Sequence, residues 1–331
     1  MQVGNLDVQP GVKTRGFVET EGWMEAIRVR IPILACCGNK PGPMLAVVAG
    51  QHGRELNGAE AVRRVFEELS PEKLAGTFIA TPFANPLAVR LRYQAYPEEF
   101  RPSIPGINLN RTWPGKADGT PVERMAYALW HAVVKHADCV VDIHGWSHQS
   151  MGIVTVEKRH RELARVFGYA LCLERNYEGL DGGGRLNLAC YDEGIPQVIA
   201  ELPLQNTLGE PGISMGVRGL RNLLVHLGMM EGELDLPSEQ VWVNDESVEH
   251  ELIAEVPGML LPQLEPGAML AEGDVIAVLV SLETLEVVQE VRSPVDGLLF
   301  NVGISRPGSP PESSVATGGE RVAIVKEVMA G

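Results

Sequence analysis

The segment MLAVVAGQHGREL, residues 44–56, joins a nearly unbroken apolar run to a group of polar residues. Six consecutive apolar residues are typical of a strand covered on both faces in a mostly parallel sheet. Gly50 and Gly53 allow the backbone to turn tightly after the strand. The segment therefore predicts a buried strand that carries His52 and Glu55 to the end of a sheet.

Alternating strands and helices are predicted on either side of this segment. Apolar residues at 62, 65, 66 and 69 share one face of a helix. Further strands are expected at residues 77–83, 139–143 and 196–200, and a helix at 121–136. The alternation predicts an α/β fold, a mostly parallel mixed sheet with flanking helices, whose site lies at the carboxyl edge of the strands.

The pattern changes near residue 235, where short strands between Pro-Gly turns replace helical periodicity. We expect a catalytic α/β domain over residues 1–235 and a small all-β, barrel-like domain over 236–331. Residues 283–297, ETLEVVQEVRSPVDG, resemble the hairpin of biotinyl and lipoyl carrier domains. Glu286 stands where that family has its carrier lysine, so a barrel without a swinging arm is predicted.

Charge and composition exclude several classes of function. The formal net charge is −15 and the isoelectric point is near 5.0, which argues against nucleic-acid binding. No apolar run approaches the roughly 20 residues of a membrane span, and the N-terminal residues lack a basic start with an apolar core. Five cysteines without a CxxC pair indicate reduced thiols. A cytoplasmic protein is expected, and a homo-oligomer is compatible with these features.

His52 and Glu55 are candidate metal ligands. The alternative is a hydrogen-bonded histidine at a helix start, with a first-turn glutamate favoured by the helix dipole. A metal site is favoured because a buried strand precedes the pair and because His144 follows another buried strand. His148 competes with His144, but it lies in a polar loop. Two imidazoles and one carboxylate leave a fourth zinc position open to water, as in catalytic sites.

Two further segments carry candidate polar groups. In residues 106–114, Asn110 and Arg111 follow Asn108, and an arginine offers a planar fork of donors that suits a carboxylate. A loop arginine paired with an acid is the alternative. Glu201 ends the apolar strand at 196–200, where burial can raise its pKa toward that of a general base. A salt-bridged glutamate at the sheet edge is the alternative there.

Four motifs in order carry a resemblance to a known family. They are HGRE at 52–55, NLNR at 108–111, DIH at 142–144 and IAE at 199–201. Together they resemble the succinylglutamate desuccinylase and aspartoacylase family of zinc deacylases, which share their fold with zinc carboxypeptidases. The resemblance covers about residues 40–230, and the small β-domain also fits it.

The resemblance implies one zinc ion per chain, held by His52, Glu55 and His144, with water as the fourth ligand. Glu201 would take a proton from that water and pass it to the departing amine. Arg92 would polarise the scissile carbonyl and stabilise the oxyanion.

The resemblance also implies that Asn110 and Arg111 bind the carboxylate of the amino-acid product. Asn108 would orient the first zinc histidine, where the family often has an aspartate. The family's tyrosine from the small domain has no counterpart, since every tyrosine here lies at or before Tyr191.

These features predict a zinc-dependent amidohydrolase that removes acetyl or a similar small acyl group from an N-acylated amino acid or related compound. Its partner would be that small molecule, with neither nucleic acid nor membrane involved. The alternatives are a zinc carboxypeptidase acting on short peptides and a non-catalytic binding protein on the same fold.

Overall fold

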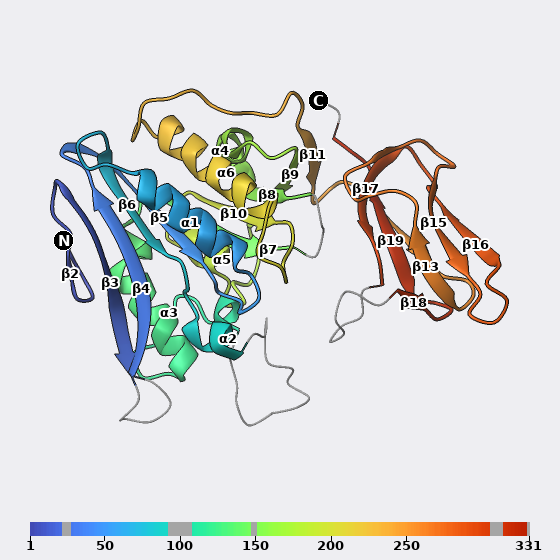
Figure 1. Cartoon of the computed structure of the whole chain (residues 1–331), viewed down its shortest axis with the longest axis horizontal. Coiled ribbons are helices and arrows are strands. Elements are labelled where there is room, and N and C mark those ends of the chain that lie inside the picture. The colour runs from blue at the N-terminus through green and yellow to red at the C-terminus, as the bar shows by residue number, and fades with distance from the viewer. Residues whose placement is uncertain (22–27, 92–107, 147–150, 305–313, 330–331) are drawn as a thin grey trace. The chain divides into compact units, whose positions relative to one another are not determined.

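The apolar segment after residue 43 lies in the interior of a large sheet (Figure 1). The computed structural model describes residues 1–21, 28–91, 108–146, 151–304 and 314–329. The chain divides into two compact units, Met1–Gln240 and Val241–Gly331. The strands of this sheet in the first unit are β3 (Val12–Glu21), β4 (Arg28–Cys37), β5 (Lys40–Ala49), β6 (Ala75–Thr81), β7 (Cys139–Gly145), β8 (Ile153–Glu157), β9 (Leu171–Arg175) and β10 (Gln197–Leu202).

The centre of the sheet is parallel and its margins are antiparallel. These strands lie in the order β9-β8-β10-β7-β5-β6-β4-β3. Strands β10, β7, β5 and β6 run parallel, whereas β8 pairs antiparallel to β10 and β4 antiparallel to β6. The predicted mostly parallel mixed sheet is confirmed. Because carboxyl ends of parallel strands meet at one edge, β5, β7 and β10 present their last residues side by side.

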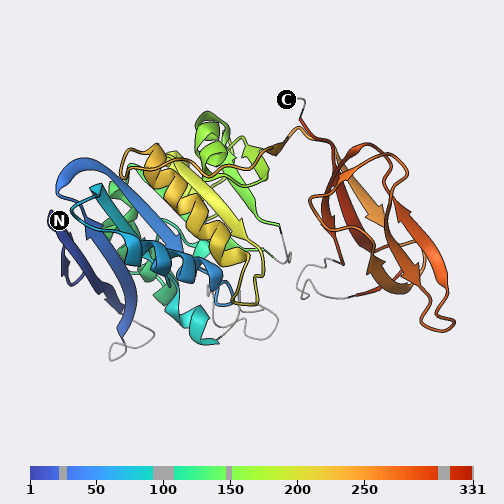
Figure 2. The ribbon, with the colours of Figure 1, turned by 45° about the horizontal axis from the view of Figure 1, so that its top comes forward.

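Helices cover both faces of this sheet. Helices α1 and α6 pack against each other on one face, and both views show them side by side (Figure 2). Helices α3 and α5 contribute to an apolar cluster on the opposite face. The helices are α1 (Asn57–Glu68), α2 (Pro86–Leu91), α3 (Pro121–Ala132), α4 (Arg161–Phe167), α5 (Leu186–Asp192) and α6 (Gly212–His226), and the 3-10 helices are η1 (Leu109–Arg111), η2 (Val134–His136) and η3 (Lys158–His160).

The helix predicted at 121–136 is shorter in the structure. Its start agrees: Thr120 forms a capping box with Glu123, and Pro121 occupies the first turn, where its missing N–H costs nothing. Helix α3 ends at Ala132 because Val133 leaves helical geometry at φ −132° and ψ −66°, and η2 follows. Apolar periodicity continues through both segments, so it could not show the break.

Two strands extend further than predicted. Strand β7 includes His144 and ends at Gly145, and β10 includes Glu201 and ends at Leu202. Hydrogen-bonded pairing continues past the last apolar residue of each strand, since Glu201 pairs with His144. Both polar residues are therefore held by the sheet itself rather than by a loop.

In its described residues the second unit contains strands and no helix, as predicted for an all-β domain. Two four-stranded antiparallel sheets have the orders β12-β19-β17-β14 and β16-β15-β13-β18. The turn between β15 and β16 contains Glu286. The strands of this unit are β11 (Val241–Asn244), β12 (Glu249–Ile253), β13 (Gly258–Pro262), β14 (Met269–Leu270), β15 (Val275–Val280), β16 (Val287–Arg292), β17 (Gly297–Val302), β18 (Val315–Ala316) and β19 (Arg321–Lys326).

A short hairpin, β1 (Gln2–Val3) and β2 (Leu6–Asp7), precedes β3. Among the described residues, no helix has both the length and the apolar character needed to cross a membrane.

Candidate metal centre

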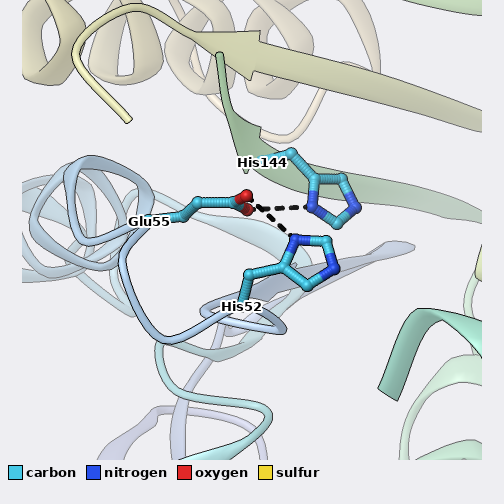
Figure 3. Close-up of side chains that lie close together, drawn as sticks. All are labelled: His52, Glu55 and His144. Atoms are coloured by element: carbon cyan, nitrogen blue, oxygen red, sulfur yellow. Dashed lines mark hydrogen bonds and ion pairs between the residues drawn. The ribbon is translucent and has the colours of Figure 1, made fainter. Parts of the chain in front are cut away.

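His52, Glu55 and His144 converge at the carboxyl edge of the sheet (Figure 3). His52 lies in the turn after β5 and Glu55 lies just before α1, while His144 is the penultimate residue of β7. Strands β5 and β7 are parallel neighbours, with Val48 opposite Asp142. Residues about 90 positions apart in the sequence are therefore brought together by the pairing of two strands.

The carboxylate of Glu55 bridges the two histidine rings. Its Oε1 lies 2.9 Å from Nδ1 of His52, and its Oε2 lies 3.0 Å from Nδ1 of His144 (Figure 3). One ligand atom from each residue lies within 4.8 Å of the others, and all three residues are buried. Two imidazole nitrogens and a carboxylate oxygen facing one point form a donor set that fits a divalent transition metal such as zinc.

Electrostatics also favours a cation at this point. Burial would raise the pKa of Glu55, but His52 and His144 outweigh it and hold the pKa far below its usual range. Burial would lower the pKa of His144, but Asp142 and Glu55 raise it well above its usual value. The site thus stabilises positive charge between its carboxylates. A metal ion would replace the proton there, since ligating histidines must be neutral.

Asp142 precedes His144 by two residues on β7, and its carboxylate contacts the imidazole ring of His144. Oδ2 of Asp142 lies 3.0 Å from Nε2 of His144, and Oδ1 accepts a 2.7 Å hydrogen bond from Nε2 of Gln51. Gln51 in turn accepts a hydrogen bond from the indole of Trp113. A carboxylate that accepts the Nε2 proton leaves Nδ1 of His144 free to face a metal.

Amide side chains support the other two members of the cluster. Nε2 of His52 lies 3.2 Å from Oδ1 of Asn108. Gln205, in the loop after β10, donates a 3.0 Å hydrogen bond from its amide to Oε1 of Glu55. These contacts restrict the rotation of the imidazole and of the carboxylate, so the ligand atoms are held in place before any ion arrives.

The loop that carries Gln205 is held by Asn57 at the start of α1. The amide of Asn57 donates to the carbonyl oxygens of Pro203, Leu204 and Thr207, and its Oδ1 accepts from the backbone of Gly209. Leu204 has a φ of 65°, a conformation that residues other than glycine rarely adopt. One buried side chain therefore stabilises a strained loop next to the cluster.

Glu201 lies beside His144 because β7 and β10 pair in parallel register. Paired residues of neighbouring strands point to the same face, about 4.8 Å apart. Burial raises the pKa of Glu201 to about 8, with Glu55 and Asp142 adding to the effect and His144 opposing it. A divalent cation at the cluster would lower this pKa, because it favours the charged carboxylate.

Asn110 joins His144 to helix α5. Its Oδ1 accepts a 2.9 Å hydrogen bond from the backbone N–H of Leu186, and its Nδ2 lies 3.2 Å from Nε2 of His144, the ring nitrogen that also faces Asp142. Asn110 is buried. In this structure the side-chain amide of Asn110 therefore contacts Leu186 with its oxygen and His144 with its nitrogen.

Arg111 lies next to Arg185, the residue that precedes α5. Partial desolvation of its guanidinium and the charge of Arg185 lower the pKa of Arg111, although the residue as a whole is exposed. The backbone at Gly184, just before Arg185, lies against the backbone of Arg111. A Cβ atom added to Gly184 would lie 2.1 Å from the carbonyl oxygen of Arg111. Two neighbouring guanidinium groups are suited to an anionic group such as a carboxylate.

Some candidates lie outside the described residues, and some contacts had no clear signal in the sequence. Arg92 and His148 fall in ranges that the structure does not describe.

Asp142 could have been singled out from the sequence, because it precedes His144 by two residues on the same strand, and residues two apart on a strand share a face. Gln51 and Gln205 carry no such signal, since ordinary glutamines at those positions would look the same.

A conservative change at Asp142 tests how much the cluster depends on its support. In Asp142→Asn we expect affinity for zinc to fall by about 10- to 100-fold, because the amide lacks the charge that holds the His144 proton. Competition with a chromogenic chelator measures the affinity, and circular dichroism checks the fold. The exposed Asp118→Asn variant is the matched control. Equal zinc affinity in both variants would contradict the supporting role of Asp142.

Comparison with known proteins gives two kinds of relative. A curated enzyme, N-alpha-acetyl-L-2,4-diaminobutyric acid deacetylase from Halomonas elongata, is 28% identical over 273 residues, which are 78% of this chain and 77% of the relative. A crystal structure of a succinylglutamate desuccinylase/aspartoacylase from Rhodobacter sphaeroides shares the fold, with a TM-score of 0.78, 21% identity and 98% of both chains covered.

A second solved structure has the same architecture. The product-bound ectoine utilization protein EutE (DoeB) from Ruegeria pomeroyi superposes with a TM-score of 0.76, 23% identity and 98% of both chains covered. The family model of the succinylglutamate desuccinylase/aspartoacylase catalytic domain matches residues 41–226, more than half of the chain. That range contains His52, Glu55, His144 and Glu201. The protein therefore belongs to the succinylglutamate desuccinylase/aspartoacylase family.

Proposed function

We propose that this protein is a zinc-dependent deacylase that removes an acetyl group from an N-acetylated amino acid. Membership of a deacylase family and a curated deacetylase relative at 28% identity support this proposal. The observation that carries it is the position of Glu201, paired with His144 and therefore beside the His52, Glu55 and His144 cluster.

His52 and His144 would hold zinc through Nδ1, and Glu55 through its carboxylate. Zinc in such a site supplies a Lewis acid and lowers the pKa of water. Asp142, Asn108 and Gln205 keep the three ligands oriented through the contacts described above.

Glu201 would be the general base and then the general acid. Its carboxylate accepts a proton from the attacking water, whose oxygen forms the new bond to the acyl carbon. As the C–N bond breaks, Glu201 passes that proton to the amine nitrogen, so that acetate and a free amino acid leave. Its place on β10, paired with His144, supports this role, because it puts the carboxylate next to the three candidate metal ligands.

Arg111 would bind the carboxylate of the amino acid, with Arg185 adding positive charge nearby. Asn110 would set this part of the site by joining His144 to the start of α5. Arg92 retains the role of stabilising the oxyanion, which the family resemblance implies. Guanidinium groups beside the residues that would hold zinc favour substrates that carry a carboxylate close to the scissile amide bond.

A substrate panel tests the proposal. We expect the zinc-loaded protein to hydrolyse N-alpha-acetyl-L-2,4-diaminobutyric acid or another N-acetyl amino acid. Its kcat/KM should be at least about 10-fold above that for N-succinylglutamate or a dipeptide, because an active-site pocket discriminates between substrates by the size of the group it accepts. Release of the free amine measures the rate. Faster cleavage of the dipeptide would identify a carboxypeptidase, and no hydrolysis of any compound would favour a binding protein.

A further inference from the structure

A charged groove lies on the face of the sheet that α1 and α6 cover. Residues of these two helices, which lie side by side (Figure 2), and of the segment 233–235 after α6 form its walls, and its volume is about 560 Å³. Small-molecule sites in proteins typically have volumes of about 300–1,000 Å³. No residue described at the metal centre lines this groove, so a ligand bound here would contact a different set of side chains.

Two of the three arginines in the groove are already paired with carboxylates. Arg64 lies 2.9 Å from Glu60 and 2.7 Å from Glu210. Arg221 donates two parallel hydrogen bonds to Glu68, from Nε at 2.9 Å and from Nη2 at 2.6 Å. The charge of each guanidinium is therefore offset within the protein, and neither is left to bind an anion.

The third arginine, Arg218, is different. It is half-buried, and no carboxylate pairs with it in the part of the chain that the structure describes. Its Nη2 donates a 3.0 Å hydrogen bond to the carbonyl oxygen of Gly168, which holds the guanidinium in place. Its Nε is covered, so that nitrogen cannot reach a ligand, whereas Nη1 has neither a cover nor a protein partner. Because Arg218 lines the groove, Nη1 is the donor that remains for a ligand.

The opposite sign of charge comes from the segment after α6. Glu233 and Asp235 are exposed, and neither has a cationic partner among the residues described. The position of Asp235 is fixed, because its backbone N–H and carbonyl group form two 2.9 Å hydrogen bonds with the side-chain amide of Asn222. Asn222 is only 2% exposed. A buried side chain thus holds this wall, while both carboxylates stay free to bind a cation.

One positive and two negative charges in the groove are therefore uncompensated. We propose that the groove binds a diamino acid, an α-amino acid that carries a second ammonium group. Its carboxylate binds Arg218, and its two ammonium groups bind Asp235 and Glu233 through charge-assisted hydrogen bonds. Met215 and Val217 supply apolar surface for the methylene groups between them. An inorganic anion would meet two unpaired carboxylates, and a simple diamine would leave the arginine unpaired.

Three compounds form a matched series of probes. At neutral pH, L-2,4-diaminobutyrate has one carboxylate and two ammonium groups, L-2-aminobutyrate lacks the second ammonium group, and 1,3-diaminopropane lacks the carboxylate. Isothermal titration calorimetry of the full-length protein at constant ionic strength measures their affinities. We expect L-2,4-diaminobutyrate to bind saturably and each of the other two at least about 5-fold more weakly, because each loses one charged pair with the groove.

Variants separate this groove from the metal centre and from loss of the fold. Arg218→Met keeps an unbranched side chain, and Asp235→Asn leaves the backbone bonds to Asn222 intact; circular dichroism checks that both variants fold. Each should weaken binding of L-2,4-diaminobutyrate by at least about 5-fold. Arg111→Met, which changes the proposed carboxylate contact at the metal centre, should still bind it, so the result does not depend on the deacylase proposal.

Four results would overturn the proposal. They are the absence of saturable binding of L-2,4-diaminobutyrate, equal binding of either of the other two compounds, unchanged binding in both Arg218→Met and Asp235→Asn, and loss of binding in Arg111→Met alone. The last result would place the amino acid at the metal centre instead of the groove.

Discussion

Replacing Glu201 with glutamine is expected to lower kcat by about 10²- to 10⁴-fold, the range that a positioned proton-transfer group contributes. The amide has nearly the same shape but cannot accept and return a proton. Zinc content should stay the same, since none of the three candidate ligands changes. Kinetics with an N-acetyl amino acid and metal analysis of the purified variant measure the two quantities.

The exposed Glu231→Gln is the matched control for this experiment, because it makes the same chemical change at a position to which no role is assigned. It should leave both kcat and zinc content unaltered. If Glu201→Gln retains full activity, Glu201 is not the general base. If it instead loses zinc and activity together, its role is to stabilise the cluster, and the assignment of the proton-transfer step would have to move to another residue.

Removal of a metal ligand should have an effect of comparable size. In His52→Ala we expect zinc affinity to fall by more than about 100-fold, beyond the range typical of residues that only support a ligand. Activity should disappear with the metal. His52 is a better choice than His144, because removing His144 would leave the buried carboxylates of Glu55 and Asp142 without their cationic partner.

The exposed His226→Ala serves as the control for the histidine change. Its zinc affinity and activity should match those of the original protein. Dialysis against a chelator should likewise abolish hydrolysis, and added zinc should restore it in the original protein but not in His52→Ala at the same zinc concentration. Hydrolysis that survives complete removal of metal would contradict a metal-dependent reaction.

Much of the fold was predictable because local patterns and tertiary structure agree. The apolar runs that form β5, β7 and β10 are long enough to identify buried strands, and the helical periodicity before β6 identifies α1. Errors lie at the ends of elements. Helix α3 stops at Ala132, and β7 and β10 continue through His144 and Glu201, since pairing between strands depends on neighbours that no local pattern reveals.

The sequence by itself determined the short-range part of the site: His52 and Glu55, three residues apart after a buried strand, can reach one point because their separation is set by a single turn. Only the tertiary structure decided which distant groups join them. Parallel pairing brings His144 and Glu201 alongside, and a loop held by Asn57 delivers Gln205 to Glu55. These contacts depend on strand register and packing, which many residues determine jointly, so no single motif encodes them.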